Sequence, residues 1–167
     1  MYLLDTPVIS ELRKARSGRA DPGVVTWASG IASHNLYISV LSLLELENGV
    51  AAAEKKDPAS GAPLRDWLDN QVMTAFDNRV LPIDSAVAKK RAALPASGNE
   101  RDALLAATAL AHGATLVTRN TSAYRHGRVK LFNPWGYSPE TDTVDDGDWQ
   151  QVARSGPMWL KNLFLRF

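Results

Sequence analysis

The residues Tyr2-Leu3-Leu4-Asp5-Thr6-Pro7 place an acidic side chain directly after a short apolar run. Three bulky apolar residues in a row are typical of a buried strand, and proline is favoured at the start of a helix. The pattern therefore predicts a strand over residues 2–4 that leads at once into a helix. Ligands bind where the strands of open parallel sheets end, so Asp5 is a candidate functional residue. The alternative is that Asp5, with Thr6 and Pro7, only ends the strand and caps the helix.

Four more short apolar runs follow along the chain and predict further strands. They cover residues 36–39, 80–83, 115–118 and 129–132. The segments between them carry helix signals, because Asp21-Pro22 and Asp84 can cap helices and the Ala- and Leu-rich segment 99–112 stops at Gly113. A four-residue spacing of apolar side chains predicts another helix, with the stripe Leu64, Leu68, Val72 and Phe76. Alternating strands and helices predict an α/β fold with a mostly parallel sheet that helices cover on both faces.

The composition is that of an ordinary globular chain. The chain has 167 residues, of which 45% are hydrophobic and 22% charged, and its net charge of +1 argues against a general nucleic-acid coat protein. The absence of cysteine excludes disulfides and thiolate metal sites and fits a reducing cytosol. The N-terminus lacks the basic region of a signal peptide, and no apolar run approaches the roughly 20 residues of a membrane span. We therefore expect a cytoplasmic protein with no membrane association.

The composition changes after Trp135. Residues 136–167 hold three Lys or Arg and five acids, which are Glu140, Asp142, Asp145, Asp146 and Asp148. We therefore expect one domain over residues 1–135 and a C-terminal extension over 136–167, in which an acidic loop leads to an apolar tail. The apolar residues of that tail are Trp159, Leu160, Leu163 and Phe164. We expect them to pack on the domain or on a dimer mate.

Three more polar residues could form a site together with Asp5. Glu45 lies between leucines in Ser42-Leu43-Leu44-Glu45-Leu46, but Ser-x-x-Glu is also the capping-box pattern, which would give this Glu a structural role. Asp102 is expected in the first turn of a helix, where the helix dipole alone would favour a carboxylate. Asn120 follows a predicted strand, although Asn also favours turns. Each of these signals has a structural explanation when it is taken alone.

Taken together, two Asp and one Glu would provide a ligand set made only of oxygen atoms. Mg²⁺ and Mn²⁺ prefer such ligands, whereas zinc does not. A divalent ion at a carboxylate cluster activates water and offsets charge on a phosphodiester. The chain contains no glycine-rich phosphate loop, no G-x-G-x-x-G and no G-x-S-x-G motif. Hydrolysis of a small phosphate ester remains an open alternative.

Five segments, in this order, resemble the motifs of PIN-domain toxins of the VapC type. They are Tyr2 to Leu12, Ser39 to Val50, Asp102 to Ala109, Thr115 to Asn120 and Leu131 to Trp135. The resemblance covers about residues 1–135. It implies a three-layer α/β/α sandwich in which the strand at 115–118 lies beside the strand at 2–4.

The resemblance also implies a site and an activity. Asp5, Glu45 and Asp102 would hold Mg²⁺ or Mn²⁺, and Asn120 would take a fourth catalytic position that is often Asp. The implied function is a metal-dependent endoribonuclease toxin that hydrolyses RNA, is neutralised by a cognate VapB-like antitoxin and forms a homodimer. Basic side chains near the site would contact RNA, and the candidates are Arg13, Arg119 and Arg125.

The chain departs from the family pattern near the site. Pro7 replaces the usual Asn after Asp-Thr, Asn120 is neutral, and Ala123 stands where many members have a further Asp. Fewer carboxylates would weaken metal binding, since the groups around a metal tune its affinity. These departures motivate the alternative that the chain is a catalytically inactive PIN-fold module that binds antitoxin or RNA.

Overall fold

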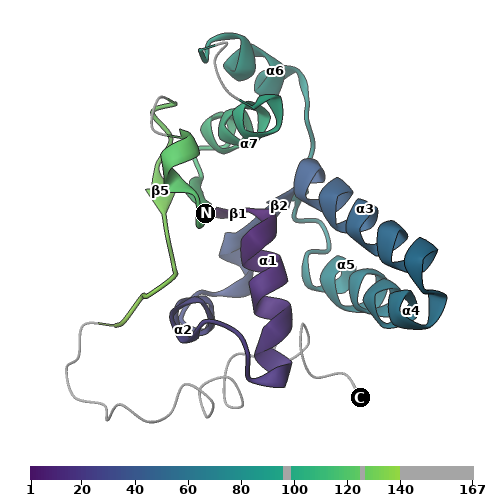
Figure 1. Cartoon of the computed structure of the whole chain (residues 1–167). Helices are drawn as coiled ribbons and strands as arrows, with labels where there is room; N and C mark the ends of the chain where they lie inside the picture. Colours follow the sequence, from purple (N-terminus) through teal and green to yellow (C-terminus); the bar gives the residue numbers. More distant parts are fainter. Residues whose placement is uncertain (96–98, 125–126, 140–167) are drawn as a thin grey trace.

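The fold is seen in a computed structural model, which describes residues 1–95, 99–124 and 127–139 (Figure 1). The strands are β1 (Tyr2–Leu4), β2 (Leu36–Ser39), β3 (Val80–Leu81), β4 (Thr115–Val117) and β5 (Leu131–Phe132). The α-helices are α1 (Thr6–Arg13), α2 (Pro22–Ser29), α3 (Val40–Lys56), α4 (Pro58–Asp66), α5 (Met73–Ala75), α6 (Ser85–Ala92) and α7 (Glu100–Ala111). Four short helical turns complete the list: η1 (Lys14–Ser17), η2 (Ser33–Asn35), η3 (Trp67–Val72) and η4 (Thr121–Tyr124).

All five predicted strands form one sheet with the order β3-β2-β1-β4-β5. Every neighbouring pair in that sheet is parallel. β1 lies at the centre, and Leu4 is in register with Ile38 of β2 and Val117 of β4. The predicted α/β class and the placement of β4 beside β1 are therefore confirmed. The carboxyl ends of β1, β2 and β4 meet at one edge of the sheet.

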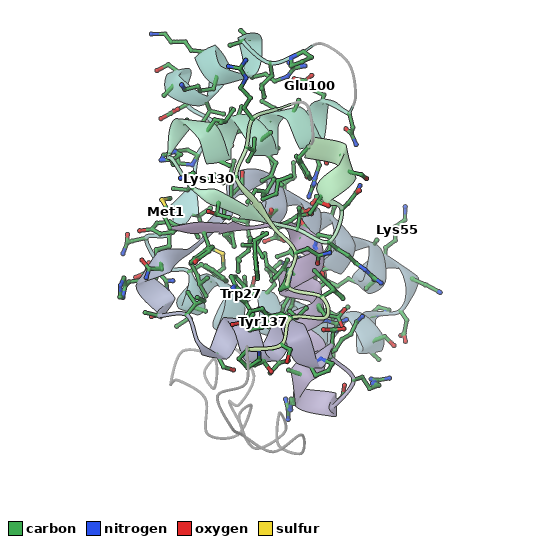
Figure 2. All side chains as sticks on the ribbon, turned by 90° about the vertical axis from the view of Figure 1, so that its left-hand side faces the viewer. Met1, Trp27, Lys55, Glu100, Lys130 and Tyr137 are labelled. Atoms are coloured by element: carbon green, nitrogen blue, oxygen red, sulfur yellow. The ribbon has the colours of Figure 1, made fainter. Side chains whose placement is uncertain are left out.

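Helices cover both faces of the sheet, and β1 contributes side chains to both cores. Leu4 belongs to a cluster with Ile9 of α1 and Trp27 of α2, whereas Leu3 belongs to a second cluster with Leu105 of α7. This alternation follows from the two-residue period of a strand. In Figure 2 the labelled Trp27 and Glu100 mark the two opposite sides of the sheet. The three layers predicted from the resemblance are present.

Helix caps expected from the sequence position the helices relative to the strands. The carboxylates of Asp21 and Asp84 accept hydrogen bonds from the backbone N–H groups of Val24 and Val87, as predicted. α7 ends before Gly113, whose φ of +62° lies in the left-handed region that glycine favours. α7 therefore begins at the edge of the sheet where the strands end.

The helix predicted from the stripe at Leu64, Leu68, Val72 and Phe76 is real but not uniform. α4 passes into the π-helical turn η3 before the short α5. Leu68, Val72 and Phe76 are nevertheless buried in the same core cluster. Three predicted strands are shorter than expected, since β3, β4 and β5 end or begin inside the apolar runs. Among the described residues, no helix has the length and apolar character needed to cross a membrane.

The residues that follow β5 pack on the domain as far as they are described. Tyr137 places its ring 6.0 Å from that of Phe132, and Phe132 in turn lies 5.3 Å from Trp27. A Cβ atom on Gly23 would meet the backbone N of Tyr137 at 2.5 Å, so only glycine permits this approach. The acidic stretch and the apolar tail, with Trp159, lie outside the described residues, and the domain boundary at 135 remains a prediction.

Candidate metal centre

Asp5 both caps a helix and lines a cleft at the edge of the sheet. Its backbone N–H donates to the carbonyl of Val117 at 3.0 Å, which fixes the residue to the end of β4. Its Oδ1 accepts the backbone N–H of Thr6 at 2.9 Å, and its Oδ2 accepts the hydroxyl of Thr118 at 2.7 Å. The side chain is only 4% exposed. The predicted capping role of Asp5 is therefore present, and the same side chain also lines the cleft.

Glu45 points into the same cleft from α3. The capping-box interpretation was wrong, because Ser39 is the N-cap of α3 and Ser42 donates instead to the carbonyl of Leu4. The Glu45 carboxylate accepts the hydroxyl of Thr6, which begins α1. Glu45 is thus free of a capping role and reaches the residue next to Asp5.

Asp102 reaches the cleft from the first turn of α7. Asn99 caps this helix through its side-chain oxygen, which accepts the backbone N–H of Arg101 at 3.0 Å. Asp102 Oδ1 accepts the hydroxyl of Tyr124 at 3.2 Å, and Tyr124 is 3% exposed. The structure therefore brings Asp5, Glu45 and Asp102 from three separate elements to one cleft of about 550 Å³.

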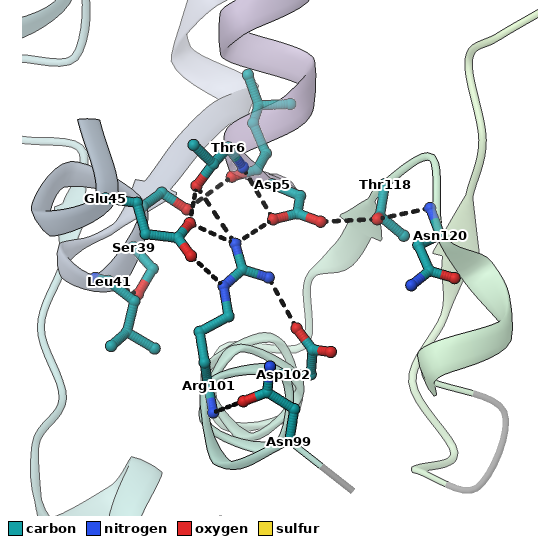
Figure 3. A network of polar contacts seen from close by, with 12 residues as sticks. Asp5, Thr6, Ser39, Leu41, Glu45, Asn99, Arg101, Asp102, Thr118 and Asn120 are labelled. Atoms are coloured by element: carbon teal, nitrogen blue, oxygen red, sulfur yellow. Dashed lines mark hydrogen bonds and ion pairs between the residues drawn. The ribbon is translucent and has the colours of Figure 1, made fainter. Parts of the chain in front are cut away.

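A guanidinium group occupies the space between the three carboxylates (Figure 3). Arg101 forms ion pairs with Asp5 at 2.5 Å, with Glu45 at 2.6 Å and with Asp102 at 2.9 Å. Its Nε donates a further hydrogen bond to Glu45 at 2.8 Å, and one Nη donates to Tyr124 at 3.2 Å. The Arg101 side chain is 23% exposed, so it covers the acids from the side of the cleft while part of it still contacts solvent.

The charges in this cluster stabilise one another. Burial lowers the pKa of Arg101, but the hydrogen bonds that Arg101 donates to Glu45, Asp5 and Asp102 outweigh it and hold that pKa above its usual value. Burial raises the pKa of Glu45, and the hydrogen bonds donated by Arg101 and Thr6 outweigh burial and leave the pKa below its usual value. The pKa of Tyr124 is raised by burial and by the negative charges of Asp5 and Asp102. At neutral pH the guanidinium is therefore charged, Glu45 is ionised and the phenol is neutral.

Asn120 lines the cleft, and its hydrogen bonds go to Thr118 and Ser122. Its backbone N–H donates to the hydroxyl of Thr118 at 3.1 Å, and its side-chain oxygen accepts the hydroxyl of Ser122 at 2.7 Å. Thr118 is fully buried and joins this turn to Asp5. The sequence contained Thr118 at the end of a predicted strand, but its hydroxyl carried no separate signal. Thr118, Tyr124 and the position of Arg101 are the parts of the site that sequence reasoning missed.

Of the three arginines expected to contact RNA, two do not line the carboxylate cleft and the third lies outside the described residues. Arg119 places its guanidinium 5.4 Å from the ring of Trp135, and Arg13 lies 5.7 Å from the ring of Trp67. Arg13 lines a separate cleft of about 440 Å³ between the end of α1 and α4. Arg125 lies outside the described residues. None of the three is placed among the residues that line the carboxylate cleft.

The donor atoms of the cleft suit a hard divalent cation. Asp5, Glu45 and Asp102 offer carboxylate oxygens, which are the ligands that Mg²⁺ and Mn²⁺ prefer. Within the part of the chain that the structure describes, however, no three acidic or imidazole side chains form a ready cation cage. The guanidinium of Arg101 explains this arrangement, because it takes the central position in which a cation could contact all three acids.

Comparison with known proteins places the chain in a family. Residues 2–129 match the PIN domain. The VapC ribonuclease Y4jK of Sinorhizobium fredii is 35% identical over 144 residues, which are 81% of this chain and 98% of that protein. Toxin FitB of Neisseria gonorrhoeae is 35% identical over 146 residues, which are 81% of this chain and 99% of that protein. The crystal structure of FitAcB from Neisseria gonorrhoeae matches with a TM-score of 0.73 at 32% identity and covers 81% of this chain and 99% of that one.

The chain therefore belongs to the PIN-domain family and is homologous to the VapC and FitB toxins. PIN domains are nucleases, and this family is typically metal-dependent. The match extends over nearly the whole length of these relatives, and the sheet edge that carries the carboxylates lies within residues 2–129.

Proposed function

We propose that the chain is a metal-dependent endoribonuclease toxin that hydrolyses RNA phosphodiester bonds. The observation that carries this proposal is the convergence of Asp5, Glu45 and Asp102 on one open cleft. A Mg²⁺ or Mn²⁺ ion bound by these acids would activate water and offset charge on the phosphodiester. Homology to a VapC ribonuclease supports RNA as the substrate class.

The chain's own residues determine how rigid such a site is. The Asp5 carboxylate is fixed by hydrogen bonds to both of its oxygens, from Thr6 and Thr118. Asp102 is fixed by Tyr124. Glu45 is 37% exposed, more than Asp5 at 4% and Asp102 at 23%, so it has the most freedom to adapt to a ligand. We propose that Asn120 faces the substrate side of the cleft as a neutral hydrogen-bonding group.

Cleavage of RNA tests this function. Purified protein without a partner is incubated with total cellular RNA and Mn²⁺, Mg²⁺ or EDTA, beside Asp5→Asn, which keeps the size of the side chain and removes its charge. We expect cleavage only with a divalent ion and only by the wild type. Absence of cleavage with binding of RNA retained would favour the inactive binding module, an alternative that Arg101 supports because it already neutralises part of the acidic cluster.

We propose a VapB-like antitoxin as the protein partner. A related toxin has been crystallised as FitAcB, and this chain covers 99% of the matched structure. The basic cleft lined by Arg13, Arg19 and Trp67 is a candidate contact, since it offers positive charge beside an apolar ring. Arg13→Glu should weaken capture of the cognate VapB-like antitoxin, whereas unchanged capture would place the contact elsewhere.

We also propose a homodimer, as many VapC-type proteins form. Val40 and Leu44 lie one turn apart on α3 and are 38% and 55% exposed, so they offer an apolar contact for a second copy of the chain. Light scattering measures the mass directly. We expect a dimer for the wild type and a monomer for Leu44→Asp, and a monomeric wild type would refute the proposal.

A further inference from the structure

The carboxylate cleft carries its own cation. Arg101 precedes Asp102 in the first turn of α7, so the helix that delivers one acid also delivers the guanidinium. The guanidinium contacts all three acids at 2.5–2.9 Å. The contacts with Asp5 and Glu45 span 96 and 56 residues of sequence, so Arg101 connects the end of β1 and helix α3 to α7 at the site.

A second arginine, Arg65, shows how the Arg101 cluster differs from an exposed cluster of the same kind. Arg65 also binds three acids, Glu47, Glu54 and Asp69, but its side chain and those of its partners are all at least 31% exposed. Asp5, in contrast, is 4% exposed. A buried carboxylate needs a positive partner more than an exposed one does, because water no longer stabilises its charge. Arg101 therefore supplies charge that the acids at this site require.

A divalent ion and the guanidinium would compete for the same carboxylate oxygens. Each needs the oxygens of Asp5, Glu45 and Asp102, and each would repel the other at the same position. We propose that Arg101 is a built-in counter-cation that holds the metal position until the ion displaces it. Arg101 thereby sets how much divalent ion is needed to load the site. This inference rests on the proposed function, since it assumes that the same three acids bind the ion.

The displaced guanidinium has an open route. Arg101 is 23% exposed, and its backbone stays fixed by the Asn99 cap, so only the side chain has to rotate. Its neighbours in the cleft include the neutral side chain of Asn120 rather than a further acid. After displacement, Arg101 remains a charged donor at the rim of the cleft, where a phosphate group would enter.

Mn²⁺ affinity measures the competition without any RNA. The free Mn²⁺ signal in electron paramagnetic resonance is followed at pH 7 for the wild type, Arg101→Met and Arg65→Met. We expect Arg101→Met to bind Mn²⁺ more tightly on the order of tenfold, the scale on which residues around a metal change its affinity. We expect Arg65→Met to match the wild type, because its three acids lie outside the cleft.

The outcomes separate this proposal from the proposed function. Equal or weaker binding by Arg101→Met would overturn the competition and leave the metal site itself intact. Absence of binding by the wild type and by Arg101→Met would overturn both. If Arg101→Met fails to fold, Arg101→Gln replaces it and is judged in the same way. Tighter binding than in the wild type supports competition, and equal or weaker binding overturns it.

A measurement on the wild type gives an independent readout. The Nε–H of Arg101 donates to Glu45 at 2.8 Å, so its exchange with water should be slow. We expect titration with Mg²⁺ to accelerate that exchange in nuclear magnetic resonance spectra, with the signal assigned by its loss in Arg101→Lys. Binding of Mg²⁺ at the site with no change in the exchange of Nε–H would overturn displacement.

Discussion

The hydroxyl of Thr118 stabilises the fold through its hydrogen bond to Asp5, a contribution that the sequence did not reveal. The substitution Thr118→Val tests this contribution. Thr118 is fully buried, and valine has nearly the same shape, so the substitution leaves the packing intact. It removes the hydrogen bond to Asp5 Oδ2 at 2.7 Å and the acceptor of the Asn120 N–H. The first of these bonds joins a buried charged group, and the second involves an exposed residue that water can satisfy.

The expected cost follows from that difference. A hydrogen bond to a charged group contributes roughly 1.5–3 kcal/mol, and its loss leaves a carboxylate oxygen of Asp5 buried without this donor. We therefore expect Thr118→Val to lower the free energy of unfolding by about 2 kcal/mol. For a chain of this length that loss corresponds to a decrease in Tm of roughly 4–8 °C.

Urea unfolding at pH 7 in EDTA measures this cost, with Thr118→Ser as the control. Serine keeps the hydroxyl and loses one methyl group, so Thr118→Ser should be destabilised by less than Thr118→Val. A loss below about 0.5 kcal/mol for Thr118→Val, the level of an ordinary surface substitution, would refute the reasoning. Equal destabilisation by serine and valine would refute it as well, because packing and not the hydroxyl would then be responsible.

Two further predictions concern packing and pH. Gly61→Ala should destabilise the chain by about 1–3 kcal/mol in urea unfolding, since its Cβ would lie 2.5 Å from Glu54 Cα, whereas Gly49→Ala on the open side of α3 should stabilise it by about 0.5–1 kcal/mol. Glu45 has a lowered pKa in the folded state, so its contribution is present above its unfolded pKa of about 4.3 and is lost as pH falls through the folded pKa. The urea midpoint in EDTA should therefore fall less steeply below pH 4.5 in Glu45→Gln than in the wild type, and parallel profiles would contradict this.

The sequence predicted the elements of the fold better than it predicted their connections within the site. Apolar runs located every strand in the described part of the chain, because burial of a parallel strand selects apolar residues over its whole length. The capping box at Ser42 failed, because Ser39 lies at the true helix start and a four-residue motif does not show which serine that is.

The position of Arg101 could not be read from the sequence for a related reason. Its partners Asp5 and Glu45 lie 96 and 56 residues away, so only the assembled fold brings them together. The neighbouring Asp102 was found because it belongs to a recognisable motif. The contact between Thr118 and Asp5 depends in the same way on the pairing of β4 with β1, and that pairing was expected only from the resemblance.

The location of Mn²⁺ in crystals of the protein tests the central claim most directly. Anomalous scattering from crystals soaked in Mn²⁺ identifies the ion without relying on activity. We predict a peak bonded to Asp5, Glu45 and Asp102, with the guanidinium of Arg101 moved away from that position. A crystal in which Arg101 still bridges the three acids at saturating Mn²⁺, with the ion elsewhere or absent, would contradict the account.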